Sequence, residues 1–277
     1  MQTISEIREI LNERGLHPKH RLGQNFLHDQ NQLRRLLDAS EVGSGDLVLE
    51  VGPGTGTLTE ALLDKGCDVI ASELDNDMGD IIESRLGTRL TLIRGDCLDG
   101  PRAFSSDVLA ALDDRPFRLV ANLPYGAASP IMSLLAAEPS CLGQFVTIQR
   151  EVGDRLLARA GTRQYGPLTV FVRAFADVRS IGTLSPNCFW PAPKVESIMI
   201  GIVPRESPME VSEKDLGKTI HLIFSKRRKQ LGTILGRSEP LPEGIDPQRR
   251  PDSLEIEEVL ILAKHLSDAG RFKDDQK

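Results

Sequence analysis

Short apolar runs alternate with helical segments between residues 46 and 149, and this alternation constrains the fold more than any other feature of the chain. The apolar runs are LVLEV (47–51), CDVIASEL (67–74), LTLIRGD (90–96), FRLVANLP (117–124) and QFVTIQ (144–149). Strands that are apolar on both faces are typical of parallel sheets, because helices cover both of their faces. The sequence therefore predicts an α/β fold built around a mostly parallel sheet.

The pattern changes in the second half of the chain. Residues 168–178 and 195–205 alternate polar and apolar positions, and we expect them to form antiparallel strands at one edge of the sheet. From about Pro204 onward the apolar spacing is helical. We therefore predict two domains: residues 1–204 hold the sheet and the site, and residues 205–277 form a small all-helical domain.

The 277 residues have the composition of an ordinary soluble globular protein, with 40% hydrophobic and 27% charged residues. No apolar run approaches the roughly 18 residues of a membrane-spanning helix, and the charged N-terminal stretch lacks the apolar core of a signal peptide. The cysteines are far apart and form no C-x-x-C pair, which argues against a metal site. We expect a cytoplasmic protein without a metal. We also expect a monomer, because no exposed heptad or apolar stripe stands out.

Glycines and acidic residues follow the predicted parallel strands. Gly52, Gly54 and Gly56 come directly after the first strand, where glycine lets the backbone turn sharply and approach a ligand. Glu73 ends the second strand and can accept hydrogen bonds from ribose hydroxyls. Asp96 ends the third strand and could accept from an adenine amino group. Together these residues indicate a site for an adenosine-containing cofactor, whereas the glycines alone also fit a tight strand-to-helix turn.

The glycine spacing narrows the class of cofactor. Dehydrogenases carry G-x-G-x-x-G, but here Glu50 precedes G-x-G-x-G, and the chain shows no evident hydride-transfer constellation. The stretch looks like the first motif of the S-adenosylmethionine methyltransferases. We therefore predict a Rossmann-like methyltransferase sheet with antiparallel edge strands, and S-adenosylmethionine as the cofactor.

Asn122, Leu123, Pro124 and Tyr125 follow the fourth strand and lie at the same edge of the sheet. The exocyclic amine of a base is a poor nucleophile, so an enzyme has to hold its hydrogens and aim its lone pair at the methyl group. The side-chain carbonyl of Asn122 and the backbone carbonyl of Leu123 are candidate acceptors, Pro124 restricts the Leu123 backbone, and Tyr125 can stack on the base. Positioning alone can promote such a transfer. Without the neighbouring glycines and acids, a strand-ending turn would be the simpler interpretation.

A basic cluster lies near the C-terminus. Lys226, Arg227, Arg228 and Lys229 are consecutive, although the whole chain has a formal charge of −6. Such a cluster can contact the phosphates of a nucleic acid, and the alternative is a solvated charged face. We predict that it binds RNA.

Several stretches resemble the KsgA family of ribosomal small-subunit RNA adenine dimethyltransferases over nearly the whole chain. They are GQNFLHD, LEVGPGTGTLTEALL, ASELD, RGD, ANLPY, QREVGDRLLA, YGPLTV, FWPAPKVES, IHLIFSKRRKQL and IDPQRRPDSL. The last segments favour the small-subunit branch over relatives that methylate large-subunit RNA. The resemblance implies dimethylation of N6 of two adjacent adenosines near the 3′ end of small-subunit RNA. It also implies binding to an assembling small ribosomal subunit.

The resemblance also implies roles for particular residues. Asn25 and Leu27 would line the cofactor site together with the glycines, the two acids and Asn122. Phe189 would stack on the target adenine opposite Tyr125. The chain departs from the family at two places: GAAS (126–129) follows NLPY, which predicts a looser loop, and Gly232 and Thr233 replace a common Arg-Asn pair in the basic helix.

Two other functions fit the same residues. The protein could serve ribosome assembly mainly by binding the immature subunit, with methylation dispensable. The chemistry could also act on another adenine, in DNA or in large-subunit RNA.

Overall fold

The structure is a computed structural model of the chain, and it describes residues 1–100, 103–206, 211–236 and 240–272. The chain divides into two compact units. Unit 1 comprises Met1–Gly153 and Arg179–Pro204, and unit 2 comprises Asp154–Val178 and Arg205–Lys277.

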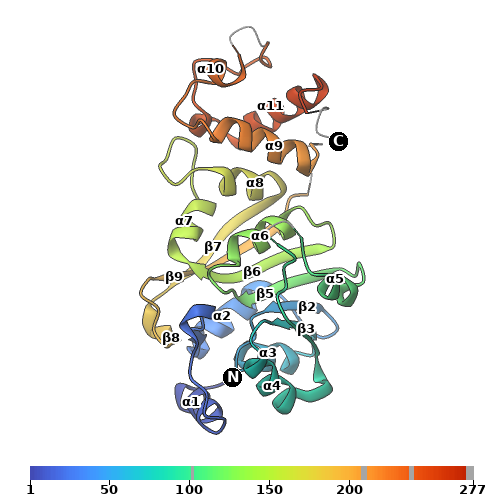
Figure 1. Ribbon diagram of the computed structural model, residues 1–277, viewed down its shortest axis with the longest axis vertical. Helices are drawn as coiled ribbons and strands as arrows, with labels where there is room; N and C mark the ends of the chain where they lie inside the picture. Colours follow the sequence, from blue (N-terminus) through green and yellow to red (C-terminus); the bar gives the residue numbers. More distant parts are fainter. Residues whose placement is uncertain (101–102, 207–210, 237–239, 273–277) are drawn as a thin grey trace. The chain divides into compact units, whose positions relative to one another are not determined.

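A seven-stranded sheet organises unit 1, with the strand order β4-β3-β2-β5-β6-β9-β7 (Figure 1). The strands are β2 (Leu47–Val51), β3 (Asp68–Glu73), β4 (Thr91–Arg94), β5 (Phe117–Asn122), β6 (Cys141–Gln149), β7 (Ala176–Leu184) and β9 (Ser197–Pro204). The first five strands in this order pair in parallel, and β9 pairs antiparallel with β6. The order reverses between β2 and β5, which is where ligands bind in open α/β sheets. The predicted Rossmann-like fold with an antiparallel strand near one edge is confirmed.

The helices that lie between or next to these strands in the chain are α2 (Gln30–Ser40), α3 (Thr57–Asp64), α4 (Asn76–Leu86), α5 (Ser106–Leu112), α6 (Ala128–Ala136) and α7 (Arg150–Leu156), with a 3₁₀ turn, η2 (Gly87–Arg89), before β4. Helices α3 to α6 connect successive parallel strands, whereas α2 precedes β2 and α7 follows β6. Helix α2 begins at the Asp29 N-cap, whose carboxylate accepts from two backbone N–H groups. It buries Leu33, Leu36 and Leu37 in an apolar core that also contains Val120 of β5.

The N-terminal segment forms a second, smaller apolar cluster in unit 1. Helix α1 (Ile4–Asn12) buries Ile7 and Leu11 against Met78 and Ile81 of α4. A 3₁₀ turn, η1 (His20–Leu22), then leads to β1 (Phe26–Leu27), which pairs antiparallel with β8 (Phe189–Trp190) after η3 (Pro186–Cys188). Trp190 stacks on Phe26 within this cluster, with 6.3 Å between the ring centroids. It is therefore a packing residue in this structure.

Unit 2 is helical around its own core. Its helices are α8 (Pro167–Phe175), α9 (Glu213–Phe224), α10 (Leu231–Leu235) and α11 (Ile256–Asp268), with the 3₁₀ turn η4 (Pro251–Ser253) before α11. Tyr165 is fully buried in this core and donates a 2.7 Å hydrogen bond to the Leu254 carbonyl oxygen. The predicted C-terminal helical region is present.

One predicted strand is wrong, and it changes the division of the chain. Residues 168–178 were expected as an edge strand, but α8 occupies Pro167–Phe175 and the strand β7 begins only at Ala176. Pro167 at the first helical position and the Thr169 hydroxyl, which accepts from the Gly166 N–H, start this helix. Its apolar face completes the core of unit 2. The compact units therefore differ from the predicted domains 1–204 and 205–277 in the segment Asp154–Val178.

The five predicted parallel strands are confirmed within a few residues. Over the part of the chain that the structure describes, none of the helices combines the length and the apolar character that crossing a membrane requires.

Candidate active site

A pocket of about 430 Å³ opens at the carboxyl ends of the parallel strands in unit 1. The segments that follow β2, β3, β4 and β5 contribute to its wall, and residues 20–27 contribute another side. This volume lies in the range of small-molecule sites. Ten predicted site residues line it together: Asn25, Leu27, Gly52, Gly54, Glu73, Asp96, Asn122, Leu123, Pro124 and Tyr125.

The glycine turn is in close contact with two walls of the pocket. A Cβ atom on Gly52 would lie 3.1 Å from Cγ of Pro124, and one on Gly54 would lie 2.9 Å from the Phe26 ring. Both glycines also have positive φ angles, 74° and 59°. Larger residues are therefore excluded by space and by backbone conformation, so that the turn and the NLPY segment pack directly on each other.

Glu73 connects the end of β3 to the glycine turn. Its Oε2 accepts a 3.1 Å hydrogen bond from the Gly54 N–H, and Oε1 accepts a 2.8 Å bond from the Asp75 N–H. Burial raises the pKa of Glu73, and these backbone hydrogen bonds act in the opposite direction. Asp96 is exposed at the end of β4, and its Oδ1 accepts from the Leu98 N–H. Both carboxylates lie where the sequence predicts cofactor contacts.

Glu50 is a further carboxyl group in the pocket wall, and the sequence analysis assigned it no role. It lies within β2 with 1% of its surface exposed, and its Oε2 has no hydrogen-bond partner among the described residues. Burial raises the pKa of Glu50 to about 8, the Thr59 hydroxyl opposes this shift, and the charge of Glu73 adds to it. A buried, unpartnered carboxyl of this kind suits a cationic ligand, because a positive charge would favour its ionised form.

Asn25 and Leu27 lie at the end of a segment that is tied to Asp75, the N-cap residue of α4 just after β3. Lys19 Nζ contacts Asp75 Oδ1 at 2.6 Å, and Gln24 Nε2 donates to Asp75 Oδ2 at 2.7 Å. The hydrogen bonds from Lys19 to Asp75 and Asp77 raise the pKa of Lys19, which therefore keeps its charge. These contacts hold residues 19–25 beside the pocket, and this tether was not anticipated because its partners are more than 50 residues apart in the sequence.

Asn122 offers one free acceptor in the pocket. Its Nδ2 donates a 3.0 Å hydrogen bond to the Asn25 carbonyl oxygen, which fixes the amide. Its Oδ1 is buried and has no partner among the described residues. An unpaired buried acceptor is costly, so it marks a place where a ligand's N–H groups would be stabilised. The Leu123 N–H donates to the Thr147 carbonyl oxygen, which anchors the segment to β6.

Tyr125 is half-buried at the rim of the same pocket. Its hydroxyl makes a 2.9 Å hydrogen bond with Oγ of Ser197, a buried residue at the start of β9. Burial raises the pKa of Tyr125, and the Ser197 hydrogen bond acts against this rise. Ser197 therefore holds the ring, and sequence reasoning missed it because 72 residues separate the two partners.

Phe189 is not brought to the pocket. Its side chain is 3% exposed and packs in the apolar core with residues of α2 and β6, and its backbone pairs with Leu27. In this conformation the ring is not available to stack on an adenine opposite Tyr125. Its stacking role stays a prediction that requires the ring to leave the core.

The basic cluster in unit 2 contains one residue with a structural role. Arg227 turns toward its own unit, where Nε contacts Asp252 at 3.1 Å and the two Nη atoms donate to the carbonyl oxygens of Thr162 and Arg163. Lys226, Arg228 and Lys229 are exposed. RNA binding by this cluster stays a prediction, and the donors of Arg227 are used within unit 2 to hold the loop at 162–163.

Comparisons with known proteins identify the family of the chain. The family model for ribosomal RNA adenine dimethylase matches residues 15–267. Ribosomal RNA small subunit methyltransferase A of Cutibacterium acnes is 34% identical, over 98% of this chain and 96% of the relative. The protein of the same description from Mycobacterium tuberculosis is 37% identical, over 94% of this chain and 86% of its own length.

A solved structure shows the same fold. The dimethyladenosine transferase from Plasmodium falciparum matches with a TM-score of 0.72 at 24% identity, covering 88% of this chain and 98% of the other. The extent of the family match, together with the pocket at the strand ends, settles the class of the protein. The chain belongs to the ribosomal RNA adenine dimethylase family, whose members are S-adenosylmethionine-dependent methyltransferases.

Proposed function

We propose that the protein transfers methyl groups from S-adenosylmethionine to N6 of two adjacent adenosines near the 3′ end of small-subunit ribosomal RNA. The observation that carries the proposal is Asn122, which lines the pocket together with the half-buried Tyr125 and whose buried Oδ1 has no hydrogen-bond partner among the described residues. The names of the relatives, which specify the small ribosomal subunit, support the choice of RNA.

The cofactor fits the residues of the pocket. Glu73 and Asp96 supply acceptors for an adenosine moiety. Glu50 supplies a buried carboxyl whose ionised form a cationic ligand would stabilise. When bound, the cofactor supplies an electrophilic methyl group. The protein contributes position: Oδ1 of Asn122 accepts from the amine of the target base, with the Leu123 carbonyl as the predicted second acceptor. Such a base has to leave its stack to reach a pocket of this kind.

The direct test is methyl transfer from radiolabelled S-adenosylmethionine to undermethylated small subunits, followed by nucleoside analysis. We expect N6,N6-dimethyladenosine in small-subunit RNA. Asn122→Ala is the matched variant, and its product should lack the label. Equal labelling of naked DNA or of large subunits would contradict the proposed substrate.

The assembling small subunit is the partner that we propose for unit 2, in the cytoplasm. Lys226, Arg228 and Lys229 are exposed on it, and Arg163 is exposed in the loop that Arg227 holds. The side chain of Arg227 therefore brings two basic segments together, residues 226–229 and the loop at 162–163. A group of exposed cations of this kind can contact several phosphates.

Salt dependence and melting temperature distinguish the exposed cations Lys226, Arg228 and Lys229 from Arg227. Neutralising Lys226, Arg228 and Lys229 together should reduce the slope of log affinity against log salt by about 2 to 3, since each phosphate contact contributes roughly 0.7 to 0.9. Arg227→Ala should instead lower the melting temperature, because it leaves Asp252 and two carbonyl groups without their donor. An unchanged slope in the triple variant would mean that these cations only solvate the surface.

Binding and methylation are distinguishable functions. Asn122→Ala tests this if it still binds the immature subunit but transfers no methyl groups. The assembly of small subunits in the presence of this variant then shows whether binding alone supports assembly. Normal assembly would favour the alternative that the protein acts mainly as an assembly factor.

A further inference from the structure

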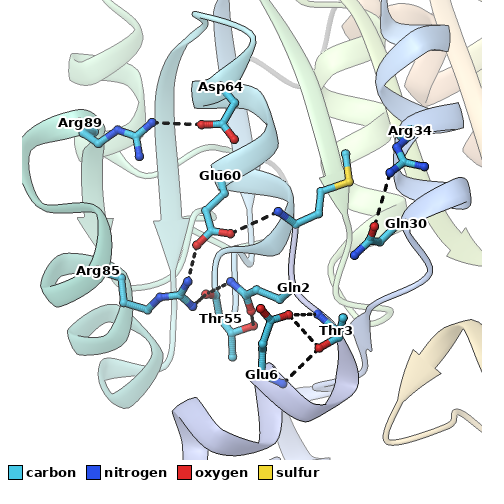
Figure 2. Close-up of polar contacts among 11 residues, drawn as sticks. Gln2, Thr3, Glu6, Gln30, Arg34, Thr55, Glu60, Asp64, Arg85 and Arg89 are labelled. Atoms are coloured by element: carbon cyan, nitrogen blue, oxygen red, sulfur yellow. Dashed lines mark hydrogen bonds and ion pairs between the residues drawn. The ribbon is translucent and has the colours of Figure 1, made fainter.

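Gln2 is a buried amide that contacts the glycine turn from outside the pocket. Its side chain is 3% exposed, and Gln2 itself does not line the pocket. Nε2 donates a 2.9 Å hydrogen bond to the Thr55 carbonyl oxygen, and Oε1 accepts a 2.8 Å hydrogen bond from the Thr55 hydroxyl (Figure 2). Both ends of the amide are therefore committed to one residue, which lies between Gly54 and Gly56.

Thr55 needs such an external restraint. It is 2% exposed and lines the pocket, but the glycines on both sides have positive φ angles and wide conformational freedom. The Thr55 carbonyl also accepts a 3.0 Å hydrogen bond from Nη1 of Arg85 on α4. Since the peptide bond is planar, holding this carbonyl also fixes the orientation of the Gly56 N–H, which donates to the Pro53 carbonyl oxygen.

The restraint reaches residues that face the cofactor. The Gly54 N–H donates to Oε2 of Glu73, and Gly54 and Glu73 both line the pocket. The Gly54 N–H lies two peptide groups before the Thr55 carbonyl in the same turn, so a shift of the Thr55 backbone can be passed along the turn to this hydrogen bond. Contact with Thr55 thus links a residue outside the pocket to the carboxylate that is expected to hold the ribose.

Gln2 is itself held in place by the helix that follows it. Thr3 and Glu6 form a capping box at the start of α1, in which the Glu6 carboxylate accepts from the Thr3 N–H at 2.6 Å (Figure 2). Ile7 and Leu11 then pack against α4. The amide is therefore preorganised against the turn and needs little ordering when the cofactor binds.

We propose that Gln2 is a positioning residue for cofactor binding, which acts by orienting the Thr55 peptide in the glycine turn. This inference rests on the use of S-adenosylmethionine by the family and not on the identity of the RNA. It can therefore be tested by binding of the cofactor alone, so that its failure is distinct from a wrong RNA substrate.

The test is the Kd of S-adenosylmethionine measured by calorimetry on the full chain. Gln2→Met replaces the amide with an apolar side chain of similar length and removes both hydrogen bonds. We expect its Kd to rise about tenfold, since each bond contributes a few-fold. In methyl transfer, KM for the cofactor should rise in parallel, with kcat at saturating cofactor within about twofold of the wild type.

The matched control is Thr3→Ala, which breaks the capping box in the same segment and does not touch Thr55. It should lower the melting temperature and raise Kd clearly less than Gln2→Met does, because both hydrogen bonds between Gln2 and Thr55 remain. An equal rise of Kd in both variants would reduce Gln2 to a general stabiliser of the N-terminus. A Kd within twofold of the wild type in Gln2→Met would also overturn the proposal.

Substitutions of Thr55 test the path of the effect. Thr55→Ser keeps the hydroxyl and should weaken binding clearly less than Thr55→Val, which removes it. The combination of Gln2→Met with Thr55→Val should be much less than additive, because each change removes the same hydroxyl contact. Full additivity would refute action through Thr55. If Gln2→Met does not fold, the comparison of Val with Ser at position 55 decides, and equal binding by both overturns the proposal.

Discussion

Glu50→Gln should change how the stability of unit 1 depends on pH. The folded protein holds a proton on Glu50 up to about pH 8, whereas the ordinary pKa is 4.5. Between these values the folded state carries one proton that the unfolded state has released, so stability falls as pH rises through this window. The slope is about 1.4 kcal/mol per pH unit in the middle of the window. The contribution of Glu50 therefore falls by about 2.5 kcal/mol between pH 5 and pH 7, because the unfolded carboxyl is only partly ionised at pH 5.

Glutamine keeps the shape of Glu50 and removes the titration. At pH 5 the variant and the wild type should have similar free energies of unfolding. At pH 7 the free energy of unfolding of the variant should exceed that of the wild type by about 2.5 kcal/mol. Urea unfolding followed by tryptophan fluorescence measures this in the right place, since Trp190 is the single tryptophan of the chain and lies in unit 1.

The control is Glu9→Gln, which makes the same chemical change on an exposed position of α1. The difference between this variant and the wild type should be nearly the same at both pH values. If the difference for Glu50→Gln is also the same at pH 5 and pH 7, Glu50 is ionised in the folded protein. The argument from its burial would then be refuted.

Three further changes test the pocket. Glu73→Ala should weaken binding of S-adenosylmethionine by about 1–3 kcal/mol in calorimetry, since it removes the carboxyl acceptor that is expected to hold the ribose hydroxyls. Asn122→Ala should lower kcat by about 100-fold or more while calorimetry still detects the bound cofactor, because it removes the free Oδ1 acceptor. Ser197→Ala releases the Tyr125 hydroxyl and should lower kcat several-fold. Tyr125→Phe keeps the ring and removes the same hydrogen bond, so an equal loss of kcat in that variant would assign the effect to the hydrogen bond.

The sequence predicted those parts of the fold whose signals are local. The parallel strands are continuous apolar runs that end in glycine or acidic residues, so both their positions and the site at their ends could be inferred. Helix α8 was mistaken for a strand because Val170, Phe171 and Val172 favour strands, and the start signal at Gly166 and Pro167 was outweighed. Tertiary packing in unit 2 decided the outcome.

The site was predictable as a set of strand ends but not as a network of contacts. Gln2 and Thr55 are 53 residues apart, and Tyr125 and Ser197 are 72 residues apart, so no local pattern connects them. The burial of Phe189 was missed for the same reason, because its neighbours come from α2 and β6. The inward turn of Arg227 was hidden within a run of similar cations.

The chain passes between the two units three times, after Gly153, after Val178 and after Pro204. A fragment that begins at residue 205 would lack α8 and Tyr165, and would expose the apolar core that they complete. Exchange of only the C-terminal third between relatives would likewise combine α9 and α11 of one protein with α8 of another. Chimaeras that exchange unit 2 between relatives should therefore carry Asp154–Val178 together with the C-terminal helices, as a discontinuous module.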